Sequence, residues 1–74
     1  MKPYKNVSGD SGVVAYAIGA DFIDVAFKGG ARYRYSNRSA GKDKVEAMKL
    51  LAAAGRGLST FIARAQPGYE PDPD

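Results

Sequence analysis

The sequence predicts an α+β domain in which a three-stranded antiparallel β-meander is followed by two helices packed on one face of the sheet. The period of the apolar residues changes along the chain. It is two as far as about residue 36 and becomes helical, about 3.6, after Ser39. The connections between the strand-like segments are also short, which is typical of antiparallel hairpins.

Three segments are expected to be strands: 13–18, 22–28 and 31–36. The first lies in "GVVAYAIG", an apolar run rich in β-branched and aromatic residues and bounded by glycines. The second, "DFIDVAFK", alternates between apolar residues and a more polar set that includes Asp24. The third, "ARYRYS", alternates strictly between arginine and tyrosine, so it sends one residue type to each face of the sheet.

The loop between the second and third strands decides which way the tyrosines face. A two-residue turn at 29–30 would pair Val25 with Arg34 and place arginines among the aliphatic side chains. A three-residue loop, 28–30, pairs Val25 with Tyr33, and glycine accepts the left-handed conformation at its last position. The apolar pattern favours this longer loop, which sends the tyrosines to the helix-covered face. The residues expected on the open face are Asp24, Lys28, Arg32 and Arg34.

Helices are expected over 43–54 and 58–65, where apolar residues recur at helical spacing. Ser39 and Asp43 are both candidates for the N-cap of the first helix, and Gly55 is positioned as its left-handed C-cap. We interpret "GRG" as a tight turn between the helices, and Pro67 ends the second helix. The alternative interpretation of "GRGLS" as a phosphate-cradling loop lacks the Gly-Lys-Ser/Thr ending of nucleotide loops.

The composition argues against an enzyme. The chain has no cysteine and no histidine, which removes disulfides, thiol chemistry and the residue most used for acid–base work near neutral pH. Neither the Asp43–Glu46 nor the Asp21–Asp24 pair has a third acid beside it, so we expect no catalysis, cofactor or metal. No apolar run approaches the roughly 20 residues that span a membrane. The N-terminus also lacks the apolar region of a signal peptide, so a cytoplasmic location is expected.

Positive charge is concentrated in residues 1–65. The chain as a whole carries +3, but this part holds all 11 Lys and Arg against five acids, which gives +6. Residues 70–74 contain three acids and two prolines and are expected to form a disordered acidic tail. We therefore expect one domain over 1–69 with an ordered core of about 11–66.

Seven residues are candidates for binding nucleic acid, because cations pair with phosphates and tyrosines stack on bases. They are Arg32, Arg34, Arg38, Lys42, Lys44, Tyr33 and Tyr35. For the tyrosines the alternative is core filling, which the favoured register supports. For the cations the alternative is solvation of the open face and of the helix start. Lysines near a helix N-terminus oppose the helix dipole, however, which indicates a use other than stability.

The order of the segments "FIDVAFKGG", "YRY", "VEAMKLLAAAG" and "GRGLSTFIARAQPGY" resembles the KTSC domain. This family is named after a lysyl-tRNA synthetase C-terminal extension and also occurs as free-standing bacterial or phage proteins. The resemblance covers residues 11–69. Tyr33 and Tyr35 match the family's Tyr-x-Tyr signature. Its closing pattern is matched by Gly55, Gly57, Phe61, Ile62 and Tyr69. Many members have a Val-Pro step where this chain has "NRSAGKD", so the entry into the helix is expected to differ.

The resemblance implies a small domain for which RNA binding has been proposed, and it carries over no catalytic residues. Our hypothesis from the sequence is a non-catalytic module that binds RNA or single-stranded nucleic acid through a basic sheet face. The alternative is a small protein-interaction module that docks on an acidic partner surface. The sequence leaves the oligomeric state open.

Overall fold

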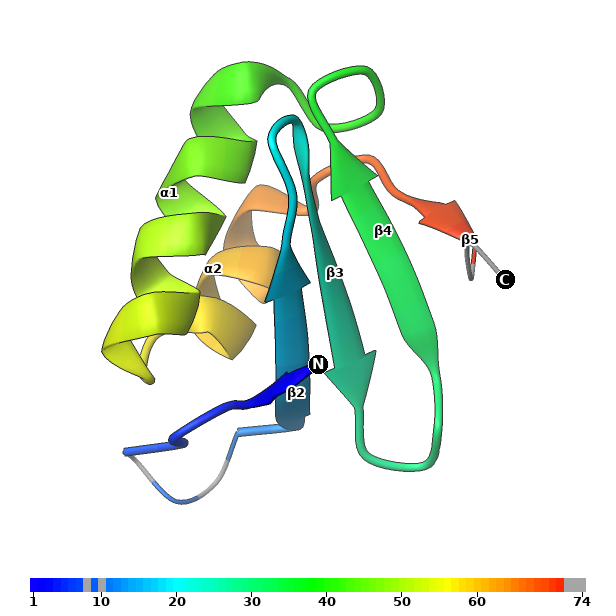
Figure 1. The fold of residues 1–74 in the computed structure, drawn as a ribbon. Coiled ribbons are helices and arrows are strands. Elements are labelled where there is room, and N and C mark those ends of the chain that lie inside the picture. The colour runs from blue at the N-terminus through cyan, green and yellow to red at the C-terminus, as the bar shows by residue number, and fades with distance from the viewer. Residues whose placement is uncertain (8, 10, 72–74) are drawn as a thin grey trace.

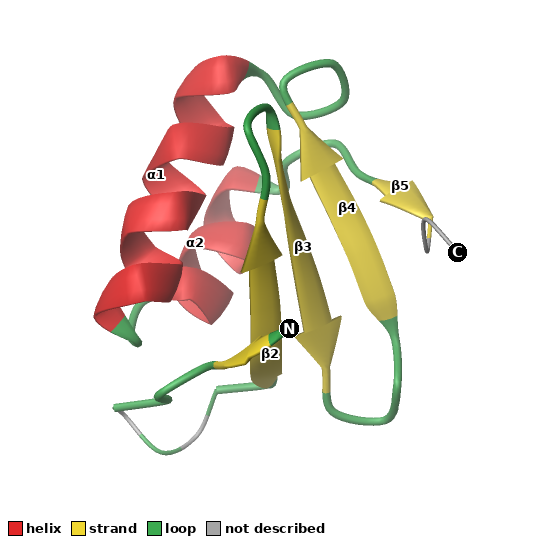
Figure 2. Cartoon of the chain, viewed as in Figure 1, coloured by secondary structure: helices red, strands yellow, loops and turns green. Residues whose placement is uncertain are grey.

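The computed structural model describes residues 1–7, 9 and 11–71 (Figure 1). Strands β2 (Val13–Ile18), β3 (Phe22–Phe27) and β4 (Arg32–Ser36) form the centre of an antiparallel sheet. Helices α1 (Lys42–Ala54) and α2 (Leu58–Ala65) both lie on one side of it (Figures 1 and 2). The predicted α+β class is therefore confirmed, and each of these elements begins and ends within one residue of its predicted bounds.

The sheet has five strands, so the prediction of three was too few. Short strands β1 (Lys2–Pro3) and β5 (Glu70–Pro71) add to its two edges, in the order β1-β2-β3-β4-β5. The expected ordered core of 11–66 was therefore too narrow. The prediction of a disordered tail is wrong for residues 70–71, which pair with β4, and residues 72–74 lie outside the described residues. Pairs this short are held by backbone hydrogen bonds and leave no periodic side-chain pattern to recognise.

The register between β3 and β4 is the predicted one. Val25 lies opposite Tyr33, and Ile23 lies opposite Tyr35. The loop between the strands is closed by the Phe27 N–H, which donates to the Ala31 carbonyl at 2.8 Å. The two glycines of this loop, at 29–30, have φ angles of 92° and 96°. These left-handed angles are ones that only glycine adopts readily, and they fix the loop length that sets the register.

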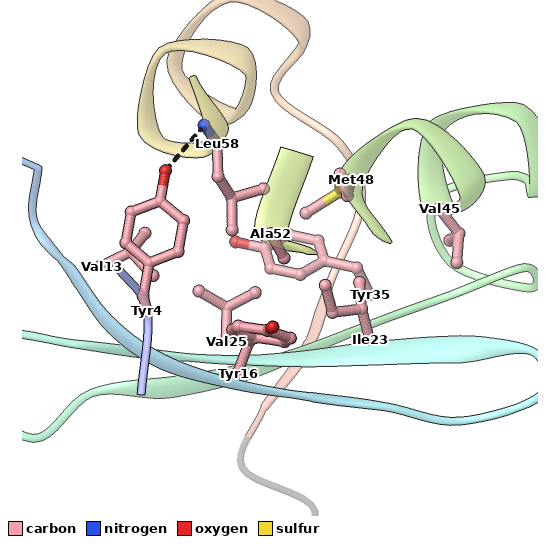
Figure 3. Packing of buried hydrophobic residues seen from close by; sticks show 10 residues of the cluster. All are labelled: Tyr4, Val13, Tyr16, Ile23, Val25, Tyr35, Val45, Met48, Ala52 and Leu58. Atoms are coloured by element: carbon pink, nitrogen blue, oxygen red, sulfur yellow. Dashed lines mark hydrogen bonds between the residues drawn. The ribbon is translucent and has the colours of Figure 1, made fainter. Parts of the chain in front are cut away.

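A buried apolar cluster fills the space between the sheet and the two helices (Figure 3). It consists of Tyr4, Val13, Tyr16, Ile23, Val25, Tyr35, Val45, Met48, Ala52 and Leu58. Tyr4 precedes the predicted core, yet it is only 6% exposed. Its hydroxyl accepts a hydrogen bond from the Leu58 N–H at 3.3 Å, shown by the dashed line in Figure 3. The N-terminal segment therefore ties the sheet to the start of α2.

The ends of α1 were predicted in part. Gly55 is its left-handed C-cap, with φ of 78°, and its N–H donates to the Leu51 carbonyl at 3.0 Å, as expected. The N-cap is Gly41, so neither Ser39 nor Asp43 has the predicted capping role. The Ser39 hydroxyl instead accepts from the Ser36 N–H at 3.0 Å and donates to the Gly68 carbonyl at 3.1 Å. Among the described helices, none has the length and apolar character needed to cross a membrane.

Candidate functional site

Arg34 is committed to contacts within the sheet. Its Nε and Nη2 groups donate to the two carboxylate oxygens of Asp24, at 2.7 and 3.0 Å. The guanidinium carbon also lies 3.9 Å from the centre of the Phe22 ring. The hydrogen bond to Asp24 raises the pKa of Arg34 above its already high ordinary value. This side chain therefore has its bidentate edge and one face occupied, which leaves little with which to hold a phosphate.

The centre of the open face is not cationic. Glu70 lies opposite Arg34 in the β4–β5 pair, and its carboxylate accepts a hydrogen bond from the Ser36 hydroxyl at 2.6 Å. A surface pocket of about 210 Å³ opens here, lined by Asp21, Phe22, Arg34, Ser36, Arg38 and Glu70. Because Arg34 is paired with Asp24, the pocket has two acids, Asp21 and Glu70, and one remaining base, Arg38. The expectation of a basic sheet face is therefore not supported at this point.

Arg32 lies at the other end of β4, beside the β3–β4 loop. It is partly exposed and pairs with Ala26 across the strands. Lys28, in the loop itself, is exposed. The length of β4 separates these two cations from Arg38, which follows the strand at the opposite end. The predicted cations therefore do not form one continuous track.

Two of the candidate cations come together at the start of α1, Lys42 and Lys44, and Arg38 lies in the turn before it, where it lines the pocket with Asp21 and Glu70. Arg38, Lys42 and Lys44 are all exposed. A hollow of about 350 Å³ lies beside the two lysines, lined by Ala40, Gly41, Lys42, Asp43 and Lys44. The first intrahelical bond is the one from Val45 to the Gly41 carbonyl, so the N–H groups of residues 42–44 precede it. Glycine at the N-cap supplies no side chain to satisfy them.

The two candidate tyrosines lie on the helix-covered side. Tyr35 is 3% exposed and belongs to the core, and Tyr33 is half-buried. Core filling is therefore the role that the structure gives Tyr35. Burial raises the pKa of its hydroxyl, and the neighbouring hydroxyls of Tyr33 and Tyr69 raise it further. Neither tyrosine lies on the open face beside the arginines.

Tyr69 is a candidate that reasoning from residue types missed, since it entered only through the family pattern. It is 57% exposed, and its ring lies 4.6 Å from that of Tyr33 and 6.1 Å from that of Tyr35, edge to face in both cases. The ring borders a pocket of about 470 Å³ lined by Tyr35, Ile62, Gln66, Pro67, Gly68 and Tyr69. The sequence feature that could have pointed to Tyr69 is that it is a lone aromatic residue next to a polar, proline-rich end of the chain.

Within the described residues, no group of three or more acidic side chains is arranged to hold a metal ion. Comparison with protein-family models, with curated proteins and with solved structures gave no match. A functional assignment therefore depends on the geometry of this chain itself.

Proposed function

We propose that the protein is a non-catalytic module that binds RNA or other single-stranded nucleic acid and holds backbone phosphates at the start of α1. One observation carries this proposal. Two exposed lysines, Lys42 and Lys44, line the hollow at a helix N-terminus whose N-cap is a glycine, and the exposed Arg38 lies in the turn that precedes it.

A phosphate accounts for an arrangement that is otherwise unfavourable. Lysines in the first turn of a helix oppose the positive end of its dipole. The N–H groups of the same turn point outward and attract anions. An anion at this position would be favoured by the dipole, by the N–H groups and by the surrounding cations. Asp43 is the one acid of this first turn, and Lys42 and Lys44 outnumber it.

The charge over the whole surface supports a polyanion as the partner. Eight of the 11 Lys and Arg side chains are exposed, against four exposed acids among the described residues, and the chain as a whole carries +3. Such an excess draws polyanions toward the protein before any specific contact forms. A single strand is proposed rather than a duplex, because only an unpaired strand presents its bases for stacking beside its phosphates.

The test is the salt dependence of binding. A short, labelled single-stranded RNA is titrated with the protein, and fluorescence anisotropy is followed over a range of salt concentrations. If about three phosphates are neutralised, log affinity should fall against log salt with a slope near −2. The triple variant Arg38→Gln, Lys42→Gln, Lys44→Gln should bind more weakly, with a slope close to zero.

A second triple variant provides the matched control. Lys5→Gln, Lys28→Gln, Arg56→Gln removes the same charge from exposed positions. The β3–β4 loop and the C-terminal end of α1, which carry Lys28 and Arg56, lie at the opposite end of the domain from the start of α1 (Figure 1). Equal losses in the two variants would mean that only net charge matters. No binding of RNA, or equal binding of an acidic peptide of matched charge, would favour the protein-interaction alternative instead.

A further inference from the structure

The pocket beside Tyr69 lies next to the start of α1. Gly68 packs so closely against the turn before α1 that a Cβ added to it would lie 2.1 Å from the Ser39 carbonyl oxygen. The Ser39 hydroxyl also donates to the Gly68 carbonyl. Ala40 and Gly41, which follow Ser39, line the hollow at the helix start. One layer of backbone therefore separates the apolar pocket from the cluster of cations.

The pocket is built to receive a flat apolar group. Its walls are Tyr35 of β4, Ile62 of α2 and the segment 66–69 that follows α2, and its volume of about 470 Å³ lies within the range of small-ligand sites. The Tyr69 ring is held edge to face by Tyr33 and Tyr35, and the residue is 57% exposed. A ring fixed in this way offers its π surface without a large loss of side-chain entropy.

Gln66 adds a polar group at the rim. It is the C-cap of α2, it is exposed, and its backbone is left-handed, with φ of 46° and ψ of 56°. This conformation is uncommon for a residue other than glycine, asparagine or aspartate. The side-chain amide has two N–H donors and one carbonyl acceptor, the complement of the edge of a nucleobase.

We infer that this pocket accepts one base of the bound strand, with the base stacked on Tyr69, its edge facing Gln66 and its phosphate beside Lys42 and Lys44 at the start of α1. The inference rests on the proposed function, because it places the base next to the phosphate site described above. A nucleotide carries a flat apolar ring and a phosphate as neighbours, which is the chemistry of the two adjoining sites. One stacked ring and one amide read little sequence, so binding should tolerate any base.

The test separates stacking from charge. Tyr69→Leu keeps an apolar residue but removes the ring, so RNA affinity should fall by about tenfold, within the range of about 5- to 150-fold known for a lost stacking residue. The slope against salt should stay the same, because the phosphate contacts remain. Tyr69→Phe is the matched control and should bind as the wild type does. An abasic strand should bind the wild type and Tyr69→Leu equally weakly.

A second variant covers the case in which Tyr69→Leu is misfolded. Gln66→Gly removes the amide and suits the left-handed backbone, so the domain should stay folded while RNA affinity falls several-fold. If RNA binds with the expected salt slope but both variants bind like the wild type, the base pocket is wrong and the phosphate site stands.

If the wild type binds no RNA, the phosphate site fails, and the pocket is then tested alone with adenosine, which has no charge. Shifts in the NMR signals of the Gln66 side-chain amide and the Gly68 N–H on adding adenosine would support the pocket. Unchanged signals would overturn it.

Discussion

Arg34 and Asp24 face one another across β4 and β3, and the guanidinium donates to both carboxylate oxygens, at 2.7 and 3.0 Å. Asp24 is only 8% exposed, so its charge has little access to water. A carboxylate buried to this extent depends on its partner, because loss of one member of a buried pair leaves an uncompensated charge. The pair therefore ties the two central strands together on the open face.

Arg34→Gln should lower the unfolding midpoint, because it leaves Asp24 buried without its cation. The double variant Asp24→Asn, Arg34→Gln should recover much of the loss, because no charge then stays buried. Thermal unfolding followed by circular dichroism measures both, and the two single variants complete a double-mutant cycle. A single variant that melts like the wild type would show that water, and not Arg34, satisfies Asp24. Arg34 is for the same reason a poor position at which to test nucleic-acid binding.

Tyr35 should make the domain sensitive to alkali. Burial, together with the nearby Tyr33 and Tyr69, raises the pKa of its hydroxyl above the ordinary value. The folded state then holds this proton more tightly than the unfolded state does. The resulting stability is fully present below about pH 10, the ordinary pKa of tyrosine, and is lost as pH rises through the higher folded-state pKa.

Tyr35→Phe tests this expectation, because it keeps the buried ring and removes the titrating group. The unfolding midpoint of the wild type should decline more steeply above about pH 10 than that of the variant. Lysines titrate in the same range, but they are common to both proteins and cancel in the comparison. Parallel curves for the two proteins would contradict the prediction.

The Tyr4 hydroxyl should contribute to stability through α2. It accepts the hydrogen bond of the Leu58 N–H, which has no intrahelical partner at this first position. Tyr4→Phe should therefore cost about 1 kcal/mol in the free energy of unfolding, as expected when a buried donor loses its partner. Chemical denaturation measures this difference. Tyr16→Phe is the control, since it removes a hydroxyl from another tyrosine of the same buried cluster, and equal losses would argue against a specific role for Tyr4.

The C-terminal strand should be needed for full stability. Glu70 pairs with β4 and accepts the short hydrogen bond of the Ser36 hydroxyl. A protein that ends after Tyr69 should therefore be less stable than one that ends after Pro71. The difference in the free energy of unfolding should be about 1 kcal/mol, for the lost charge-assisted hydrogen bond. Comparing these two truncations isolates β5. Identical midpoints would restore the expectation from the sequence that the chain beyond Tyr69 is dispensable.

Elements that depend on local pattern could be predicted from the sequence. An apolar run bounded by glycines predicted β2, and alternation predicted β3 and β4. The preference for apolar neighbours then set the register of Tyr33 against Val25. The Asp24–Arg34 pair follows from that register, because it places both side chains opposite one another on the open face. The geometry of the pair required the structure. It shows that the guanidinium of Arg34, which was predicted to bind phosphate, is already hydrogen-bonded to Asp24.

Features that depend on contacts between distant residues could not be predicted. β1 and β5 contain two residues each, too few for a period to be visible. Ser39 has the right chemistry for an N-cap, but Ser36 and Gly68 occupy its hydroxyl, and Gly68 lies 29 residues away. Tyr69 likewise meets Tyr33 only because β5 returns to the edge of β4. The sequence predicted the candidate site on the open face of the sheet, and the structure favours the start of α1 instead.

Stability and binding should be in conflict at the start of α1. Lys42 and Lys44 lie in the first turn of the helix, where a positive charge costs about 0.3–1 kcal/mol at low salt. Lys42→Gln with Lys44→Gln should therefore raise the unfolding midpoint at low salt while it weakens RNA binding. Because this gain is electrostatic, it should shrink as salt is added.

The effect of inorganic phosphate on the unfolding midpoint is a second test of the anion site at the start of α1. An anion that binds only the folded state raises the unfolding midpoint as its concentration increases. Added phosphate should therefore stabilise the wild type more than the double variant, at constant ionic strength. Lys5→Gln with Lys28→Gln removes the same charge away from this helix start, so it should gain no stability at low salt and should respond to phosphate as the wild type does. A double variant at 42 and 44 that is less stable than the wild type would mean that these lysines stabilise the fold, and the case for an anion site at the start of α1 would lose its main support.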